Sequence, residues 1–242
     1  MPFRLLNIDG VADYLHLTPA DVEQRVRNRE IPFEKRGDRI VFRKREIEEW
    51  ASSRILNFTG QRLTEYHGKS TRHTRDVFSG EAIIQTMVEA GAIEPAMTSK
   101  TKSSVLADLT LIAEKTGHLM ASQDLLAGLK SREELCSTAL AGGFALPHPR
   151  FHDSYLFDAS FIVVGRTVQK IHFGAHDGEP TRLFFLICCK DERLHLHALA
   201  RLCLMAKKTG IVEDLFEAPD IETMKLLLTR TEREILDDAK TN

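Results

Sequence analysis

Residues 142–150, GGFALPHPR, contain one histidine, His148, which lies between two prolines. Phe144-Ala145-Leu146 is an apolar run that predicts a short buried strand. Because proline can neither continue a helix nor donate to a sheet ladder, Pro147 and Pro149 predict that His148 lies at a strand end. A neutral imidazole keeps a nucleophilic nitrogen near neutral pH, so a histidine fixed there can attack a phosphoryl group and later release it. Taken alone, the pattern also fits a structural or surface histidine.

Other histidines raise the alternative of a metal site. Together with His148 they are His152, His172, His176, His195 and His197. His172 and His176 would share a face only on a helix, but the surrounding glycines and Pro180 indicate strand and turn. The four cysteines show no C-x-x-C spacing, which argues against a zinc site or a disulfide framework. The spacing therefore disfavours a metal ion.

Helices alternating with short strands surround the His148 segment. Helical periodicity covers residues 83–90, 103–116, 122–130, 195–209 and 221–229. Strands are predicted at residues 144–146, 159–164, 168–173 and 183–189. Helices flanking a mixed sheet define an α/β layered domain.

The N-terminal part shows a pair of short helices. Val11, Ala12 and Leu15 predict the first helix, with Asp9 as its N-cap. Thr18-Pro19-Ala20-Asp21 predicts the start of the second helix, with Thr18 as the cap and proline at the first helical position. Such a pair, with a polar face on the second helix, is typical of a helix-turn-helix.

Residues 31–42 follow as two apolar arms around Gly37-Asp38, which predicts a hairpin with a basic tip. A third helix is expected from about Arg43 to Ser52, with Ile47 and Trp50 packing inward. This order resembles the winged helix-turn-helix of the excisionase/MerR-like family, and a helical docking or dimerisation module is the alternative. The candidate DNA-binding residues are Gln24, Arg25 and Asn28 on the second helix and Lys35, Arg36 and Arg39 on the wing.

The two parts of the 242-residue sequence carry net charges of opposite sign. Residues 1–75 carry 15 Lys/Arg and 11 Asp/Glu, a net charge of +4, whereas residues 76–242 carry −6. The basic part indicates an anionic polymer as its partner.

Apolar runs fall short of the roughly 20 residues of a membrane-spanning helix, and no signal-peptide pattern is present, so we expect a cytoplasmic protein. The predicted domains are residues 1–56 and 78–237, joined by a linker over residues 57–77, in which the sequence allows a helical turn around Arg62 to Tyr66.

Several motifs of the C-terminal domain occur in a defined order. They are Arg132-Glu133, Ser137-Thr138, Gly-Phe-Ala-Leu-Pro-His148-Pro-Arg150, Asp177-Gly178-Glu179-Pro180 and His195-Leu-His-Ala-Leu-Ala-Arg-Leu202. Together they resemble the EIIA domain of the bacterial phosphotransferase system (PTS), of the fructose/mannitol type that includes its nitrogen-regulatory branch. The resemblance spans roughly residues 78–237, and Pro149 is a departure that affects local access.

The resemblance implies roles for three residues. His148 matches the histidine that accepts phosphate from phospho-HPr or its nitrogen-branch counterpart. Arg132 matches the motif arginine, whose guanidinium pairs with phosphate; a surface salt bridge with Glu133 is the alternative. His195 matches the second active-site histidine, with a helix cap as its alternative role and His197 as a competitor. Transfer between histidines needs positioning and electrostatics, so we expect no cofactor and no metal.

No EIIB or EIIC pattern accompanies these motifs, and the fused module is a candidate DNA reader. We therefore expect a PTS-linked regulator in which a phosphocarrier domain controls a DNA-binding domain. A homodimer is compatible with such a reader because these modules often bind paired half-sites. The alternatives are a phosphocarrier whose N-terminal module docks proteins, and an EIIA-like binding module that is not phosphorylated.

Overall fold

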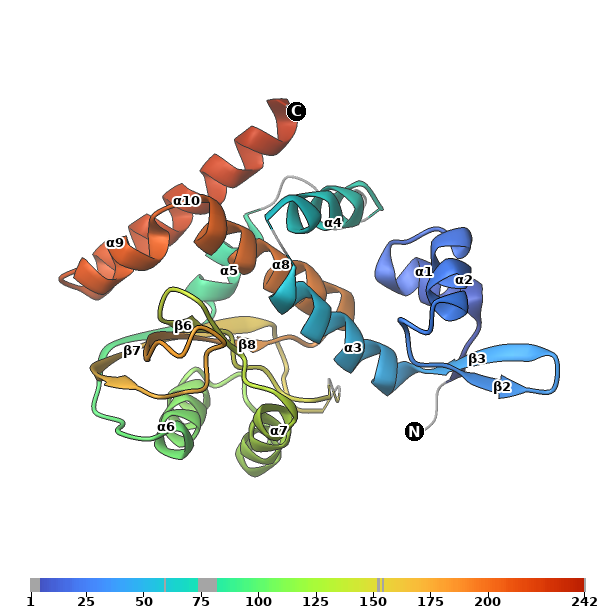
Figure 1. Ribbon diagram of the computed structural model, residues 1–242. Helices are drawn as coiled ribbons and strands as arrows, with labels where there is room; N and C mark the ends of the chain where they lie inside the picture. Colours follow the sequence, from blue (N-terminus) through green and yellow to red (C-terminus); the bar gives the residue numbers. More distant parts are fainter. Residues whose placement is uncertain (1–4, 59, 74–81, 152, 154, 242) are drawn as a thin grey trace. The chain divides into compact units, whose positions relative to one another are not determined.

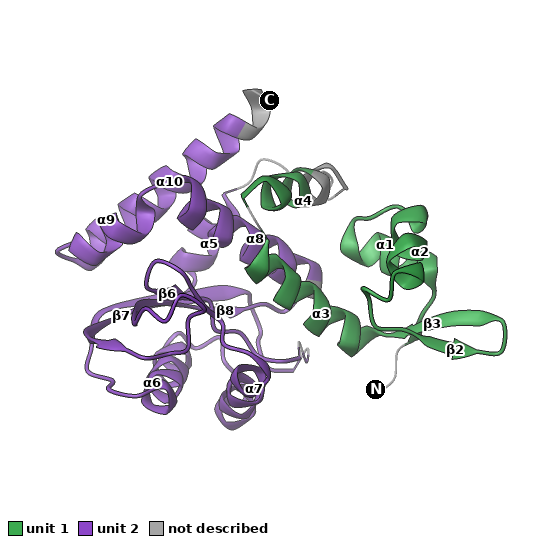
Figure 2. Cartoon of the chain, viewed as in Figure 1, with its two compact units in different colours: residues 1–79 green, residues 80–242 purple. Residues whose placement is uncertain are grey.

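The computed structural model describes residues 5–58, 60–73, 82–151, 153 and 155–241. The chain divides into two compact units, residues 1–79 and residues 80–242 (Figure 2). Each unit has its own secondary structure and its own buried core. The two units are therefore described separately.

Unit 1 is a small winged helix-turn-helix (Figure 1). Its elements are β1 (Leu5–Leu6), α1 (Ile8–Leu15), α2 (Pro19–Arg27), β2 (Glu34–Arg36), β3 (Arg39–Arg43), α3 (Lys44–Asn57) and α4 (Gly60–His73). The strands form an antiparallel sheet in the order β1-β3-β2. Residues Arg36 and Arg39 pair across a two-residue turn, which confirms the predicted hairpin at Gly37-Asp38.

Local capping explains where the two short helices begin. Thr18 and Asp21 form a reciprocal capping box at the start of α2, with Pro19 in the first turn, as predicted. The predicted cap of α1 is wrong, because Asn7 accepts a hydrogen bond from the Gly10 backbone N–H at 2.8 Å. Asp9 lies in the first turn of α1 instead, where an acidic side chain favours the positive helix end.

Helices α3 and α4 extend further than the sequence pattern indicated. Helix α3 reaches Asn57 rather than ending near Ser52. Trp50 is only half-buried, so the prediction that it packs inward is wrong in part; Ile47 is fully buried. Helix α4 lies within the predicted linker, of which residues 59 and 74–77 lie outside the described residues. As a domain boundary, the linker stays a prediction.

Unit 2 is a mixed α/β layered domain. Its elements are α5 (Ile83–Glu89), β4 (Ala92–Met97), α6 (Lys102–Lys115), α7 (Ser122–Leu135), β5 (Ala139–Leu140), β6 (Phe144–Ala145), β7 (Phe161–Ile171), β8 (Thr181–Cys188), α8 (Glu192–Lys208), α9 (Ile211–Glu217) and α10 (Ile221–Thr241). The strand order is β4-β7-β8-β6-β5. Pairs β4/β7 and β6/β8 are parallel, whereas β7/β8 and β5/β6 are antiparallel.

The sheet is covered on both faces. Helices α6 and α7 lie on one face and α5 and α8 on the other (Figure 1). Strand β8 is buried along its length except for half-buried Arg182, which explains the continuous apolar run in the sequence. The apolar side chains of α6 and α7 pack against those of β7 and β8 in one core cluster.

The structure adds elements that the periodicity did not predict. Strand β7 is continuous over residues 161–171, where two strands were expected. Strand β4 and helix α9 were not predicted. Arg166 on β7 donates from Nη1 to the backbone oxygens of Leu215, Phe216 and Ala218 at 2.7–3.0 Å, so a long-range contact satisfies the end of α9. In the part of the chain that the structure describes, no helix is long and apolar enough to span a bilayer.

Candidate functional site

The backbone around His148 is fixed by the central sheet. The Pro147 carbonyl accepts a hydrogen bond from Ile187 N at 2.9 Å, which continues the parallel pairing of β6 with β8 beyond the strand. Gly142 and Gly143 adopt φ of +92° and +80° in the turn between β5 and β6, a conformation that favours glycine. His148 therefore sits just past a strand end, as the flanking prolines predicted.

Helix α7 supports the same segment from the other side. Arg150 N donates to the Gly128 carbonyl at 3.2 Å. A side chain at Gly128 would place its Cβ 3.3 Å from Pro149 Cβ, closer than ordinary van der Waals contact. Gly128 thus permits the close approach of α7, and Pro149 is buried in the packing.

Hydrogen bonds assign the tautomer of His148, which is buried with 2% of its surface exposed. Nδ1 lies 2.8 Å from the Leu146 carbonyl oxygen, and Arg132 Nε donates to Nε2 at 3.1 Å. A carbonyl oxygen only accepts, so this geometry assigns the proton to Nδ1 and the lone pair to Nε2. Nε2 is therefore the nucleophilic nitrogen, and it faces a guanidinium group.

Arg132 lies near the end of α7 and is also buried. Its Nη1 donates to the backbone oxygen of Cys136 at 3.0 Å and to its sulfur at 3.3 Å. Its Nη2 is buried without a hydrogen-bond partner among the described residues. A buried guanidinium with an unused donor beside a nucleophilic imidazole can pair with an anion formed on that imidazole.

Two histidines of α8 divide between two environments. The His195 ring lies 4.8 Å from the His148 ring, measured between centroids, and is buried. His197 Nε2 instead lies 3.0 Å from Arg201 Nη2. Residues two positions apart lie on opposite sides of a helix, so only His195 faces His148. The structure thus brings together His148, Arg132 and His195.

Glu133 fixes the loop that precedes the His148 segment, and its role was missed in the sequence. Its carboxylate accepts from the Thr138 N–H at 2.9 Å and from the Thr138 hydroxyl, and Lys102 Nζ lies 3.2 Å away. Thr138 O in turn accepts from Leu146 N at 3.1 Å. Glu133 therefore contacts the loop rather than forming the surface salt bridge with Arg132 that the sequence left open.

Metal ligation was the alternative for the other histidines. His152 lies outside the described residues. The described residues contain no group of three or more His, Cys, Asp or Glu side chains that could hold a metal ion. His172 directly follows β7, and His176 lies in a turn, so the two do not share a helix face.

The candidate DNA-binding residues of unit 1 fall into two groups. Gln24 on α2, Asn28 at its C-cap and Lys35, Arg36 and Arg39 on the wing are all exposed. Arg25 is half-buried, and its Nη1 donates to the Asp21 carbonyl at 3.0 Å. Its side chain lines a cavity with Trp50 rather than standing on the exposed face. Arg36 also pairs with Glu34 at 3.4 Å.

Fold and site together define a phosphotransferase-system EIIA class of domain, preceded by a helix-turn-helix. The family model "Phosphoenolpyruvate-dependent sugar phosphotransferase system, EIIA 2" matches residues 81–230, and a helix-turn-helix domain model matches residues 5–55. The chain belongs to the EIIA 2 family.

Two curated relatives match part of this chain. The PTS system fructose-specific EIIABC component of Bacillus subtilis is 30% identical over 122 residues, which is 50% of this chain but 19% of that protein. A nitrogen regulatory protein of Bradyrhizobium diazoefficiens is 29% identical over 148 residues, 60% of this chain and 94% of that protein. The likeness to the Bacillus protein therefore concerns only a small part of its length.

Solved structures share the fold. Nitrogen regulatory protein IIA-Ntr from Neisseria meningitidis matches with a TM-score of 0.54 and 23% identity, over 60% of this chain and 99% of that one. IIA mannitol from Escherichia coli matches with a TM-score of 0.50 and 18% identity, over 56% and 94%. Both likenesses show a shared fold alone.

Proposed function

We propose that His148 accepts a phosphoryl group on Nε2 from phospho-HPr or its nitrogen-branch counterpart, and that this modification regulates DNA binding by unit 1. The observation that carries the first part is the position of the His148 Nε2 lone pair, 3.1 Å from Arg132 Nε. The EIIA family and the nitrogen regulatory relative support the same chemistry.

The step itself is an exchange of phosphorus–nitrogen bonds. His148 Nε2 forms a bond to the phosphorus as the bond to the donor's histidine nitrogen breaks, and the donor keeps that electron pair. Arg132 Nε must first release Nε2, because one lone pair cannot serve both the hydrogen bond and the new bond. The freed guanidinium, with its unused Nη2, then pairs with the phosphate oxygens.

The Leu146 carbonyl has a second role in this step. Phosphorylation at Nε2 places positive charge on the imidazole, and the Nδ1–H bond to this carbonyl at 2.8 Å stabilises that charge. The His195 ring lies 4.8 Å from the His148 ring, measured between centroids, at a tilt of 49°, and we expect it to donate a hydrogen bond to the phosphate. No step requires a metal or a cofactor.

For DNA, α2 serves as the recognition helix and the β2–β3 hairpin as the wing. Gln24 and Asn28 reach base edges, and Lys35, Arg36 and Arg39 contact phosphates. The helix-turn-helix match over residues 5–55 supports this role. Arg25 on α2 is half-buried and lines a cavity, so its side chain is not among these contacts.

The test of the acceptor is intact-mass spectrometry after incubation with phosphoenolpyruvate, enzyme I and HPr at mildly alkaline pH. We expect one added phosphate on wild type and on His197→Gln, and none on His148→Ala. Absence of phosphate on wild type with HPr and with its nitrogen-branch counterpart would contradict the proposal and favour an EIIA-like binding module.

Regulation is tested by selecting bound sequences from random duplex DNA and comparing the affinity of phosphorylated and unmodified protein. Because phosphorylation adds up to about two negative charges, we expect a change in affinity that His148→Ala abolishes. Equal affinities would contradict the proposal that phosphorylation regulates DNA binding.

A second test concerns the wing. The double substitution Lys35→Gln/Arg39→Gln should weaken binding of all duplexes and lower the salt dependence of that binding. Unchanged binding would favour a docking module.

A further inference from the structure

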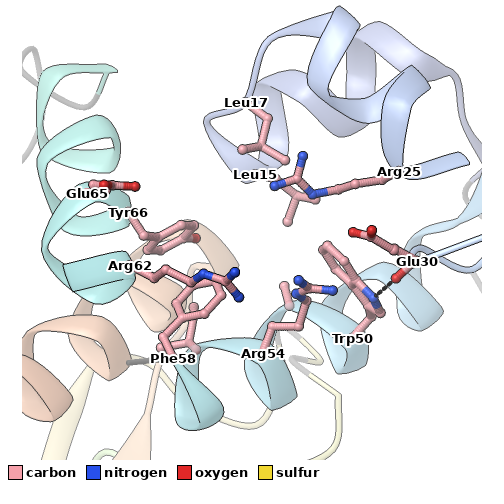
Figure 3. Close-up of a pocket in the computed structure, with 12 residues that line it drawn as sticks. Leu15, Leu17, Arg25, Glu30, Trp50, Arg54, Phe58, Arg62, Glu65 and Tyr66 are labelled. Carbon is pink, nitrogen blue, oxygen red and sulfur yellow. Dashed lines mark hydrogen bonds between the residues drawn. The ribbon is translucent and has the colours of Figure 1, made fainter. Parts of the chain in front are cut away.

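Unit 1 contains a cavity of about 390 Å³ that the proposed DNA contacts do not explain. It lies between α2, α3 and α4 (Figure 3). Its volume falls in the range of about 300–1,000 Å³ that small-molecule sites occupy. Its lining is Leu15, Leu17, Arg25, Glu30, Trp50, Ala51, Arg54, Ile55, Phe58, Arg62, Glu65 and Tyr66.

Three helices each contribute one arginine side chain to the lining of the cavity. The guanidinium groups of Arg25, Arg54 and Arg62 point into the space in Figure 3. None of the three forms an ion pair with a carboxylate among the described residues, although Arg54 stacks on the Trp50 ring at 5.0 Å. Glu30 and Glu65 are exposed lining residues. Three cations against two carboxylates favour an anion.

Two hydrogen-bond donors in the lining lack acceptors. The Tyr66 hydroxyl and Arg25 Nε are buried with no hydrogen-bond partner among the described residues. Burial raises the pKa of Tyr66 well above its ordinary value, so its hydroxyl keeps its proton at neutral pH. Buried donors without acceptors cost free energy, and a bound anion would supply the acceptors.

The remaining walls are aromatic and aliphatic. Trp50 is held by a hydrogen bond from Nε1 to the Glu30 carbonyl at 2.6 Å, and the Phe58 and Tyr66 rings pack at 5.8 Å between centroids. Leu15 and Ile55 add buried aliphatic surface. Such walls suit a ligand with a planar apolar ring system, which the sugar-phosphate backbone of duplex DNA lacks.

We propose that this cavity binds a small organic anion, with a carboxylate, sulfonate or phosphate group attached to a planar apolar body. The anionic group meets Arg25, Arg62 and the Tyr66 hydroxyl, while the body lies against Trp50 and Phe58. All of the lining residues belong to unit 1, whereas His148 belongs to unit 2.

The test uses 8-anilinonaphthalene-1-sulfonate as the probe and the full chain as the protein. Trp50 is the single tryptophan of the sequence, so energy transfer from tryptophan to the bound probe reports binding near this cavity. We expect saturable sensitised emission. Neutral N-phenyl-1-naphthylamine, which lacks the sulfonate, should bind about tenfold more weakly, the factor that one lost charged contact represents.

Two variants and a matched control locate the site. Tyr66→Phe and Arg62→Gln should each lower the affinity for the probe by about three- to tenfold, as expected for one lost hydrogen bond or charge. Arg62 is exposed, so its replacement leaves the fold intact. Arg45→Gln, an exposed position on α3 outside the lining, should leave probe affinity unchanged.

Several results would overturn the proposal. These are absence of saturable binding, equal affinity for the neutral and the sulfonated probe, and equal probe affinity for wild type and both cavity variants. A loss of duplex DNA binding in Tyr66→Phe and Arg62→Gln without a change in probe affinity would also overturn it, because the cavity would then belong to the DNA-binding surface.

Discussion

In the proposed reaction, Arg132 first donates to the attacking nitrogen of His148 and then binds the phosphate. In the unmodified site its Nε donates to His148 Nε2, while its Nη2 has no partner among the described residues. Lysine would keep the charge but lose the planar set of donors. Arg132→Lys should therefore slow phosphoryl acceptance about ten- to hundredfold, the cost of one or two charge-assisted hydrogen bonds.

Time-resolved intact-mass spectrometry with a fixed amount of phosphorylated donor measures this rate. Lys130→Arg, an exposed position on the same helix, is the control and should react like wild type. An unchanged rate in Arg132→Lys would show that the guanidinium is only a structural support.

The cysteines should differ sharply in reactivity. Burial raises the pKa of the Cys203 thiol to about 12 and also raises those of Cys188 and Cys189, so their thiolates are scarce at pH 8. Cys136 is exposed. We expect iodoacetamide to label native protein first at Cys136, read by peptide mass spectrometry, and all four thiols only after denaturation. Rapid labelling of Cys203 in native protein would contradict the packing of α8.

Motif order was enough to select His148, Arg132 and His195 as candidates from the sequence. It could not exclude His197, because the choice depends on which side of α8 faces the sheet. The role of Gly128 in admitting Pro149 against α7 could not be predicted either, since it depends on the approach of a segment that is distant in the sequence. Residue roles set by long-range packing leave no local pattern.

At the scale of elements, helices with their own start signals were predictable. Thr18-Pro19 located α2 because the cap is local. Helix α9 is short, and its C-terminal carbonyls are satisfied by Arg166 from β7, so its end is fixed by tertiary contact. Helix α4 buries Leu63 and His67 in a stretch whose overall composition is polar, which masked it. The start of α2 is therefore set by local sequence, whereas α4 and the end of α9 depend on burial and tertiary contacts.

Three helices of unit 2 meet at one buried carboxylate. Glu232 on α10 accepts from the N–H groups of Ile84 and Gln85 at the start of α5 and pairs with Arg201 on α8 at 2.9 Å. Burial lowers the pKa of Arg201, and the adjacent Glu232 opposes that shift. Neither side chain is exposed, so removing the charge of one leaves the other buried without this opposite charge.

Glu232→Gln should therefore lower the free energy of unfolding by about 3–5 kcal/mol, measured by urea denaturation. Glu234→Gln on the same helix removes only a surface pair with Arg230 at 3.5 Å, so it should change stability by less than about 1 kcal/mol. Equal effects of the two substitutions would show that the buried pair does not join the three helices energetically.

At the scale of the whole molecule, a basic N-terminal part and an acidic C-terminal part share one chain. Composition predicted this division, and the two compact units are consistent with it. The proposed phosphoryl group adds charge to the already acidic unit. In the proposed regulation, the added charge therefore lies in unit 2, whereas the helix-turn-helix lies in unit 1.

Nitrogen-15 NMR of the phosphorylated protein tests the proposed nucleophile directly, because it distinguishes the two ring nitrogens of His148 by their coupling to phosphorus. The geometry predicts phosphate on Nε2 of His148, with the proton retained on Nδ1 toward the Leu146 carbonyl. Phosphate on Nδ1, or on His195, would contradict the assignment of the nucleophile and the role given to Arg132.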